Sequence, residues 1–403
     1  MTKVNTNEKD IDEVLERGVL KDFLPTKEEF KEKLMSGKKL RFYMGFDPTA
    51  KALHLGHAQN LMVLEDFRRL GHEVIFLIGD FTGMIGDPSD KSSARVKQTP
   101  EDVKENFKGW IEQVKNIADF DDAENPFLVK YNSQWLGKLN FSEVLELAGN
   151  FTVQQMLERD MFEKRLETGK PIYLHEFLYP LMQGYDSVAM DVDVEMCGTD
   201  QIFNALAGRT LMQKISGKEK IVIANHLIAD EITGQLMSKS NGTGIFLDLA
   251  PNDLFGAIMA QSDGMIKPLA LGCTRLSLDK IEELKKQENP RDAKIELAFE
   301  IVKIFHGEDD AKKAQEYFIN TFSKKEIPDD VKEYHTQEGV DILELLVSTE
   351  GATSKSDARR KVEQGGVSID GDKVIDIKYK IQEDDDEKVL KVGKKFFVKI
   401  ILS

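Results

Sequence analysis

The chain has 403 residues, 41% of them hydrophobic, and a formal net charge of −16, which allows two or three folded domains. It contains no apolar run of the roughly 18 residues that a membrane helix needs, and its polar N-terminus lacks a signal-peptide pattern. The negative charge argues against loose attraction of the whole surface to nucleic acid. Two distant cysteines, Cys197 and Cys273, make a disulfide framework or a zinc site untenable and favour a cytoplasmic protein.

Strand and helix patterns alternate near the N-terminus. Residues 8–38 are charged and predict a helical lead-in, and residues 39–46 alternate as a strand that ends at Asp47. Apolar residues recur at helical spacing over 57–70, and Glu73–Ile78 is a short apolar run typical of a buried parallel strand. Strand, helix and strand in this order predict a βαβ unit of a doubly wound sheet.

The rest of the chain completes the expected architecture. Two more strands are predicted at 191–196 and 219–224, and a mostly helical insertion over about 100–190 precedes them. The fold class we expect is α/β, with a doubly wound (Rossmann-like) parallel-sheet domain followed by a helical domain and a small α+β domain. The expected boundaries are 1–225 for the Rossmann-like domain, 226–250 for a Gly/Ser-rich loop, 251–323 for the helical domain, 324–340 for a linker and 341–403 for the α+β domain.

The small C-terminal domain carries recognisable helix and turn signals. Ser354–Asp357 resembles a capping box that starts a helix, Gly365 and Gly366 end it, and Asp370–Gly371 predicts a hairpin turn. Basic and acidic residues nearly balance here, and four basic side chains cluster on the predicted helix: Lys355, Arg359, Arg360 and Lys361.

The first candidate site is the turn into the predicted helix at 57–70. Free N–H groups at such a helix start, after a parallel strand, favour anions. His54 and His57 are three residues apart, so both can face the same phosphate or ribose oxygens, and Gly45 and Gly56 let the backbone approach a nucleotide closely. Taken alone, the two histidines are more typical of surface or capping residues.

The second candidate is the glycine-rich loop that follows the buried strand at Glu73–Ile78. Asp87, Lys91 and Arg95 project from it, and Lys91 and Arg95 share one face if a helical turn follows. Two cations on one face suit a polyphosphate. A solvated loop is the alternative interpretation.

Polar residues also converge on one predicted helix and after one predicted strand. Tyr179, Gln183 and Asp186 lie on one helix face and need partners if they are buried. A small zwitterion with its own hydroxyl could provide them, although an incidentally polar surface face fits equally well. In the segment Gly198–Gln201, Asp200 can face a ribose diol and Gln201 a substrate.

The last candidate is the loop that contains Met237, Ser238 and Lys239. Its lysine can follow the charge that builds on a leaving pyrophosphate, and such stabilisation is usually the largest catalytic term. A lone lysine in a Gly/Ser-rich loop is, however, most often only solvated.

The order of these segments resembles a known family. The segment His54–His57 (His-Leu-Gly-His) resembles the HIGH signature of class I aminoacyl-tRNA synthetases, and Met237–Ser240 (Met-Ser-Lys-Ser) resembles their KMSKS signature. The stretches Tyr43–Ala50, Gly86–Ser89 and Gly198–Gln201 are similar to the bacterial tyrosyl-tRNA synthetases in particular, as are Tyr179, Gln183 and Asp186.

The same resemblance extends to the C-terminus, where Ser354–Val367 resembles the S-four-like RNA-binding domain of those enzymes. It therefore spans about residues 30–400 and implies a tyrosine–tRNA ligase. Such an enzyme joins tyrosine to ATP as tyrosyl-adenylate, releases pyrophosphate, and then transfers tyrosine to the 3′-terminal adenosine of tRNA(Tyr).

The resemblance also implies roles for individual residues. Tyr43 and Asp186 match the groups that hold the tyrosine hydroxyl, and Asp87, Tyr179 and Gln183 match those around its α-amino group, with Gln201 near the amino acid. The residues implied in ATP binding are Gly45, Asp47, His54, Gly56, His57, Asp200, Met237, Ser238 and Lys239. The residues implied in catalysis are Thr49, His54, His57, Lys91, Arg95 and Lys239.

Cofactors and partners follow from the same resemblance. We expect ATP with Mg²⁺ as a substrate, no tightly bound metal or organic cofactor, L-tyrosine and tRNA(Tyr) as partners, and a homodimer formed through the helical insertion. The RNA-binding residues expected are Lys355, Arg359, Arg360 and Lys361.

Two departures from the family pattern and three alternatives remain. Leu236 replaces the first lysine of KMSKS, and Met44 stands where other members can place a ribose-contacting side chain. A tryptophanyl enzyme is disfavoured by Tyr43, Asp186 and the C-terminal domain, and a small nucleotidyltransferase by chain length. A non-enzymatic RNA-binding protein, which Leu236 faintly favours, is opposed by the intact histidines and Lys239.

Overall fold

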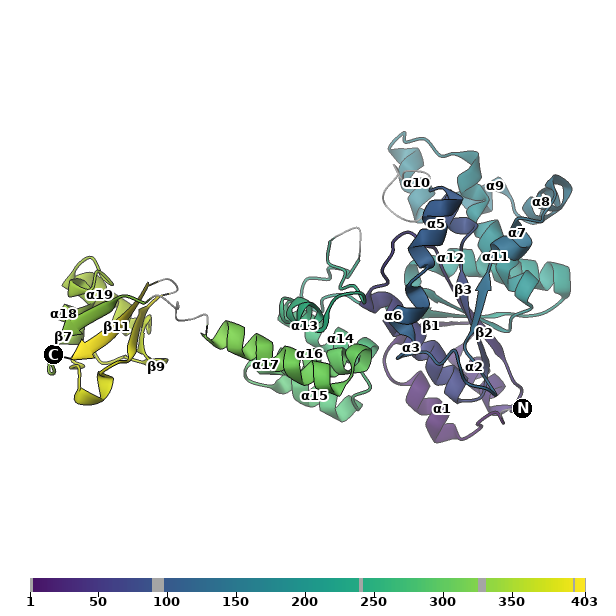
Figure 1. Cartoon of the computed structure of the whole chain (residues 1–403). Coiled ribbons are helices and arrows are strands. Elements are labelled where there is room, and N and C mark those ends of the chain that lie inside the picture. Colours follow the sequence, from purple (N-terminus) through teal and green to yellow (C-terminus); the bar gives the residue numbers. More distant parts are fainter. Residues whose placement is uncertain (1–2, 89–97, 239–241, 325–330, 394–395, 403) are drawn as a thin grey trace. The chain divides into compact units, whose positions relative to one another are not determined.

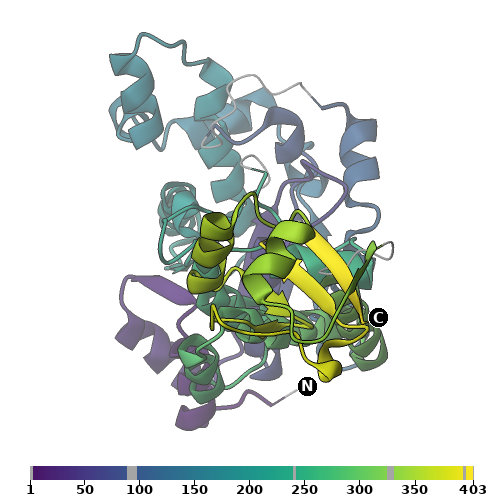
Figure 2. The same cartoon turned by 90° about the vertical axis from the view of Figure 1, so that its left-hand side faces the viewer.

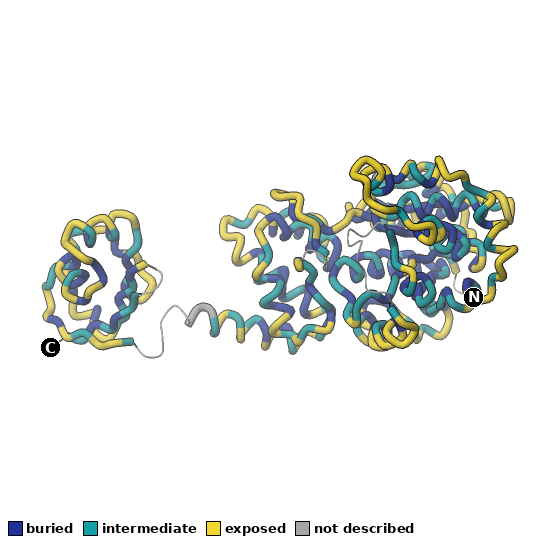
Figure 3. The backbone as a smooth tube through the Cα atoms, turned by 90° about the horizontal axis from the view of Figure 1, so that it is seen from above, coloured by how far each residue is buried: buried dark blue, intermediate teal, exposed yellow. Residues whose placement is uncertain are grey.

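The structure is a computed structural model that describes residues 3–88, 98–238, 242–324, 331–393 and 396–402. The chain divides into two compact units, Met1–Gln315 and Glu316–Ser403, and buried residues concentrate in the interior of each (Figure 3). No helix in the described part of the chain has both the length and the apolar character needed to cross a bilayer. The finer division of the chain into domains stays a prediction.

A six-stranded sheet forms the centre of the first unit, in the order β1-β6-β5-β2-β3-β4 (Figure 1). Its strands are β1 (Leu20–Leu24), β2 (Arg41–Phe46), β3 (Glu73–Ile78), β4 (Leu128–Tyr131), β5 (Val194–Gly198) and β6 (Ile221–Asn225). Strands β2 to β6 run parallel and β1 is antiparallel to β6. Every residue of β5 and β6 is buried, as expected for strands covered on both faces.

Two edge strands differ from the prediction made from the sequence. Leu20–Leu24 lies in the predicted helical lead-in but forms β1, between α1 (Glu8–Leu15) and α2 (Lys27–Met35). Leu128–Tyr131 lies in the predicted helical insertion but forms β4, paired with β3. Both strands are short and contain charged residues, because edge strands are half-exposed and lack the continuous apolar run of a central strand.

Helices surround this sheet. Helix α3 (Leu55–Arg69) connects β2 to β3, as the sequence predicts. The helices between β3 and β5 are α4 (Thr82–Ile85), α5 (Pro100–Phe107), α6 (Trp110–Val114), α7 (Ser133–Leu136), α8 (Phe141–Ala148), α9 (Val153–Leu157), α10 (Asp160–Glu167) and α11 (Tyr179–Met190). Helix α12 (Ile202–Leu211) follows β5 and packs closely on α11, because Gly184 and Gly208 lie where the helices meet.

The segment that follows is helical, as predicted. Its helices are α13 (Pro251–Met259), α14 (Ile266–Cys273), α15 (Leu278–Lys286), α16 (Pro290–His306) and α17 (Glu308–Lys324). Helix α14 lies against α3, where Gly272 leaves room for the Gln59 side chain and the Cys273 thiol meets the Leu55 carbonyl.

The second unit has a five-stranded sheet in the order β7-β11-β10-β8-β9. Its elements are β7 (Glu333–Thr336), α18 (Ile342–Ser348), α19 (Lys355–Glu363), β8 (Val367–Ile369), β9 (Asp372–Lys373), β10 (Val389–Val392) and β11 (Phe396–Leu402). Helices α18 and α19 pack on the sheet through a shared apolar core, and Figure 2 shows these green helices beside the yellow strands.

Local signals in this unit are confirmed, with one correction. Ser354 caps α19 by accepting from the Asp357 amide, and Asp370 and Gly371 turn the β8–β9 hairpin with φ angles of 47° and 94°. Residues Glu333–Thr336, predicted within a linker, instead form β7 and pair in parallel with β11. Their sequence, Glu-Tyr-His-Thr, lacks an apolar run because this edge strand buries little more than Thr336.

Candidate active site

The parallel strands of the first unit place polar residues at their carboxyl ends, where ligands bind in this architecture. Asp47 follows β2, Thr82 follows β3, Asn132 follows β4 and Asp200 follows β5. Strands β2 and β5 pair only at Phe42–Val194 and Tyr43–Glu195, before either strand ends. The strand order reverses between them, so this is the switch point at which a ligand is expected.

His54 and His57 form the N-cap of α3. The Gly56 amide donates to His54 Nδ1 at 3.0 Å, and the His54 amide donates to His57 Nδ1 at 3.1 Å. Because Nδ1 accepts in both rings, the neutral imidazoles carry their protons on Nε2, where they are donors. A Cβ on Gly56 would lie 2.8 Å from the His54 ring, so glycine is needed here to make room for the cap.

The first signature segment meets a stretch that follows the second one, far away in sequence. The Leu55 amide donates to the Ile245 carbonyl at 2.9 Å, and the Leu247 amide donates to the Leu53 carbonyl at 2.8 Å. His54 forms a β-bridge with Phe246 between these bonds. The segment that follows the Met237–Ser240 loop is therefore bonded to the start of α3, beside the histidines.

The loop itself is closed by Thr243, whose hydroxyl accepts from the Ser238 amide at 3.0 Å and donates to the Leu236 carbonyl at 2.9 Å. Met237 is buried, whereas Leu236 is exposed. The three predicted catalytic cations, Lys91, Arg95 and Lys239, lie outside the described residues.

Asp47 links three elements around the predicted amino-acid site. Its carboxylate accepts from the Tyr179 hydroxyl at 2.8 Å and from the Thr82 hydroxyl at 2.6 Å. Burial raises the pKa of Tyr179 well above its ordinary value, with the charge of Asp47 as the next cause, so the phenol remains a donor. The Thr49 amide donates to the Asp47 carbonyl at 2.8 Å, which tightens the same loop.

Asp186 lies on α11 and is 3% exposed. Its two oxygens accept from Trp135 Nε1 at 2.7 Å and from Asn132 Nδ2 at 3.3 Å. Burial raises the pKa of Asp186 well above its ordinary value, and these two N–H donors oppose the shift. Trp135 and Asn132 were not predicted from the sequence. A polar segment after β4 could have indicated them, but β4 itself was missed.

Gln201 connects the glycine-rich loop to the start of α12. Its amide donates to Asp87 at 2.6 Å and to Asp200 at 3.2 Å, and its carbonyl oxygen accepts from Asn204 at 2.8 Å. The loop residue Asp87 and the strand-end residues Asp200 and Gln201, more than a hundred residues apart, therefore form one polar cluster, as expected if they share a ligand.

Tyr43 and Gln183 contact a second group of residues that the sequence analysis missed. Tyr43 Oη lies 2.8 Å from Ser187 Oγ, and the Gln183 amide donates to Glu195 at 2.9 Å. Glu195 forms an ion pair with Lys220. A carboxylate within buried β5 and a lysine immediately before buried β6 were the available signals, since unpaired charges are rare in such strands.

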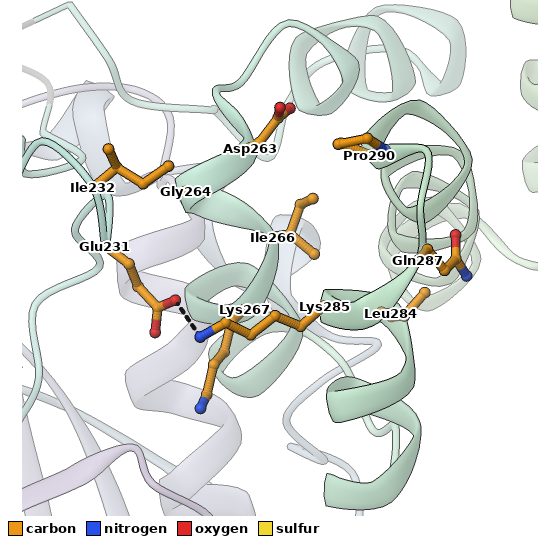
Figure 4. Close-up of a pocket in the computed structure, with 10 residues that line it drawn as sticks. All are labelled: Glu231, Ile232, Asp263, Gly264, Ile266, Lys267, Leu284, Lys285, Gln287 and Pro290. Carbon is orange, nitrogen blue, oxygen red and sulfur yellow. Dashed lines mark hydrogen bonds and ion pairs between the residues drawn. The ribbon is translucent and has the colours of Figure 1, made fainter.

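A pocket of about 200 Å³ lies elsewhere, among α14, α15 and the start of α16 (Figure 4). The Lys285–Glu231 ion pair of 3.0 Å forms part of its wall. It contains none of the residues predicted from the motifs and lies off the carboxyl ends of the strands. The hydrogen-bonded residues around Asp47 and Asp186 therefore remain the candidate active site.

The four predicted RNA-binding residues lie on α19 of the second unit. Arg360 and Lys361 pair with Asp357 at 2.6 and 3.0 Å, and Lys355 approaches Glu344 at 3.9 Å. Within the described part of the chain, no ion pair is formed by Arg359, which is exposed. One helix therefore carries all four side chains, with different degrees of local neutralisation.

Two family models together cover nearly the whole chain. Residues 35–323 match tRNA synthetases class I (W and Y), and residues 323–400 match the tyrosine–tRNA ligase SYY-like C-terminal domain. The chain belongs to the class I tRNA synthetases. This confirms the family and the Rossmann-like fold class expected from the motifs.

Curated relatives of this class I synthetase are similar over nearly their full length. It is 43% identical over 393 residues to the tyrosine–tRNA ligase of Thermotoga maritima, covering 96% of each chain. It is 41% identical over 403 residues to that of Carboxydothermus hydrogenoformans, covering 96% of this chain and 97% of the relative.

Solved structures of tyrosyl-tRNA synthetases have a similar fold. A C-terminally truncated mitochondrial tyrosyl-tRNA synthetase from Aspergillus nidulans matches with a TM-score of 0.66 and 25% identity, covering 78% of this chain and 94% of that one. The tyrosyl-tRNA synthetase from Archaeoglobus fulgidus, complexed with L-tyrosine, matches at 0.59 with 19% identity, over 77% of this chain and 100% of that one, and supports the fold alone.

Proposed function

We propose that the residues at the carboxyl ends of β2, β3, β4 and β5 carry out both steps of tyrosine–tRNA ligation. The activity follows from the family, because relatives above 40% identity over nearly the whole chain are tyrosine–tRNA ligases; this chain is a tyrosine–tRNA ligase. The observation that best supports the site is buried Asp186, held between Trp135 and Asn132 on the helix that also carries Tyr179 and Gln183.

Tyrosine binds with its hydroxyl between Tyr43 and Asp186. Asp186 is an acceptor for the phenol O–H, and buried Tyr43 is a donor to the phenol oxygen. Asp87, Tyr179, Gln183 and Gln201 surround the amino-acid backbone. Phenylalanine would leave Tyr43 and Asp186 unpaired, and such buried polar groups discriminate strongly; a tyrosyl synthetase is itself the established illustration of this effect.

ATP binds beside the N-cap of α3, where His54 and His57 present Nε2–H donors and Thr49, Gly45 and Gly56 line the approach. Asp200 contacts the ribose, and Met237 and Ser238 lie on the opposite loop. Mg²⁺ arrives with the phosphates, since it is usually held by one or two carboxylates and substrate phosphates, and Asp47 and Asp87 are carboxylates at this edge. No resident cofactor is required.

The tyrosine carboxylate attacks the α-phosphorus of ATP in line, and pyrophosphate leaves. Lys91, Arg95 and Lys239 stabilise its charge. No residue forms a covalent bond, because positioning and charge stabilisation suffice for this step. A hydroxyl of the 3′-terminal adenosine of tRNA(Tyr) then attacks the tyrosyl carbonyl, and AMP leaves. We place the enzyme in the cytoplasm, where its free thiols Cys197 and Cys273 would stay reduced.

The enzyme is proposed to be a homodimer that binds tRNA through α19. Large exposed apolar side chains gather in the segment between β4 and α11: Phe141, Leu145, Val153, Leu166, Tyr173 and Leu174. Apolar clusters of this kind mark interaction surfaces. A solution mass near twice 45.7 kDa would support the dimer, and a mass near 45.7 kDa would contradict it.

Two substitutions test the tyrosine site. Asp186→Asn and Tyr43→Phe should each raise the tyrosine KM and lower tyrosine-dependent ATP–pyrophosphate exchange by about 10- to 100-fold, because a buried hydrogen bond to a charged or phenolic group is lost. The ATP KM should stay near the wild-type value. Unchanged tyrosine kinetics in both variants would refute the assignment.

A further inference from the structure

A buried ion pair lies directly behind the proposed tyrosine site. Lys220, immediately before β6, is 0% exposed, and Glu195, in the neighbouring strand β5, is 2% exposed. Burying two charges costs several kcal/mol of desolvation, so such a pair is weak evidence of stabilisation. Its contacts point instead to a role in the binding site.

Both charges reach residues that face the substrate. The Lys220 ammonium donates to Ser187 Oγ at 2.9 Å, and Ser187 Oγ lies 2.8 Å from Tyr43 Oη. On the other side, Glu195 accepts from the Gln183 amide at 2.9 Å. One ion pair is therefore connected to the hydroxyl end of the tyrosine site and to its amino end.

The side-chain amide of Gln183 can have only one orientation toward Glu195. A carboxylate is an acceptor only, so the NH₂ group of the amide must face Glu195. The amide oxygen of Gln183 is then directed away from Glu195. An α-ammonium group requires such an acceptor, and the reversed amide would present it with N–H groups.

The hydrogen bonds around Tyr43 lie between a donor, the Lys220 ammonium group, and an acceptor, the Asp186 carboxylate. Lys220 is a donor only, so Ser187 Oγ must accept from it. Asp186 accepts from Asn132 and Trp135, one at each oxygen, and is the proposed acceptor for the tyrosine hydroxyl as well. With the Ser187 proton directed to Tyr43, the hydrogen bonds run from Lys220 to Ser187, from Ser187 to Tyr43, from Tyr43 to the ligand oxygen, and from the ligand hydroxyl to Asp186.

The Ser187 hydroxyl lies between two acceptors. Ser187 Oγ has two acceptors for its single proton, Tyr43 Oη at 2.8 Å and Glu195 at 3.3 Å, and the phenol is nearer. The Lys220 ammonium group has room only because residue 208 is a glycine. A Cβ on Gly208 would lie 2.3 Å from Lys220 Nζ. Helix α12 therefore leaves room for this lysine through a glycine.

We propose that the Lys220–Glu195 pair sets the hydrogen-bond polarity of the tyrosine site, making Tyr43 a donor to the ligand hydroxyl and Gln183 an acceptor for its α-ammonium group. Lys220, Glu195 and Ser187 are positioning residues, since none of them touches the substrate. The proposal rests on the tyrosine site described above. It assigns tyrosine specificity partly to residues behind that site.

The test compares kcat/KM for tyrosine and for phenylalanine in pyrophosphate exchange. Ser187→Ala removes the link between Lys220 and Tyr43 and should lower the tyrosine-to-phenylalanine ratio about tenfold or more, with the ATP KM unchanged. Lys220→Met should do the same, because Ser187 then turns its proton to Glu195. Glu195→Gln should raise the tyrosine KM by a similar factor, because Gln183 loses its fixed orientation.

A neutral double variant guards against misfolding. Lys220→Met combined with Glu195→Gln replaces the pair by side chains of similar size, and such replacements of buried pairs usually preserve folding. It should retain the wild-type melting temperature within a few degrees and still lose discrimination. A wild-type ratio in both this variant and Ser187→Ala would overturn the proposal.

Arg68→Met is the matched control. Arg68 forms a buried ion pair with Glu65 on α3, and its hydrogen bonds go to Glu65, Asp122 and Asn125. This control should change stability and leave the ratio unchanged; an equal fall in the ratio would overturn the proposal. Tyr43→Phe distinguishes a failure of the proposed tyrosine site from a failure of the role proposed for the ion pair. If it leaves the ratio unchanged, the tyrosine site itself is misassigned.

Discussion

His54 serves the fold and the proposed chemistry with different ring atoms. Its Nδ1 accepts from the Gly56 amide and caps α3, while its Nε2 remains the donor proposed to meet ATP. A capping histidine and a catalytic histidine are therefore compatible interpretations of the same residue. The two functions can be separated by substitution, because asparagine is a strong N-cap that lacks the Nε2 donor.

His54→Asn should keep the thermal stability of the wild type while lowering kcat of tyrosine activation by about tenfold or more. His54→Ala should lose both, with about 1 kcal/mol of stability removed together with the cap. Thermal unfolding and pyrophosphate exchange measure the two effects. Equal activity of His54→Asn and wild type would show that the residue only caps the helix.

At the scale of elements, the central strands and helices were predictable and the edges were not. Glu73–Ile78 was predicted to the residue because a strand buried on both faces has a continuous apolar run. Strands β1, β4 and β7 lack that run, and their pairing depends on partners far away in sequence. No local pattern could have shown them with equal clarity.

The candidate site was also only partly predictable from the sequence. The spacing of Tyr179, Gln183 and Asp186 predicted one helix face, and they do lie on α11. Their hydrogen-bond partners Asn132, Trp135 and Glu195 come from three other elements, so tertiary structure alone identifies them. The motif resemblance supplied the proposed roles, which spacing could not supply.

The contact between α11 and α12 gives a prediction for Gly208. Gly208→Ala would place a Cβ 2.3 Å from Lys220 Nζ and 2.9 Å from Ser187 Oγ. We expect a loss of about 1–3 kcal/mol, as for other overpacked core sites, together with weaker tyrosine binding. Urea unfolding and the tyrosine KM measure both.

Gly256→Ala is the matched comparison for that variant. Gly256 lies inside α13, and a Cβ there would meet nothing within 4 Å. Alanine should stabilise that helix by up to about 1 kcal/mol and leave the tyrosine KM unchanged. If both alanine variants behave alike, the close packing at Gly208 has no energetic consequence.

The charge of the whole molecule constrains how it can bind RNA. With a net charge of −16, long-range attraction to phosphate is unfavourable, so contacts must be local and depend on few cations. On α19, Asp357 already neutralises Arg360 and Lys361 in part, whereas Arg359 is exposed. Arg359 is therefore the side chain of this helix best placed to meet a phosphate.

Arg359→Glu should weaken tRNA(Tyr) binding and reduce the slope of log affinity against log salt by about one, the value for one phosphate contact. Aminoacylation should slow through a higher tRNA KM, because activation takes place in the other unit, while pyrophosphate exchange stays at the wild-type rate. Glu363→Gln, at the end of the same helix, is the control and should leave binding unchanged or slightly stronger. An Arg359→Glu variant with the wild-type tRNA KM and salt slope would exclude this position on α19 from the RNA interface.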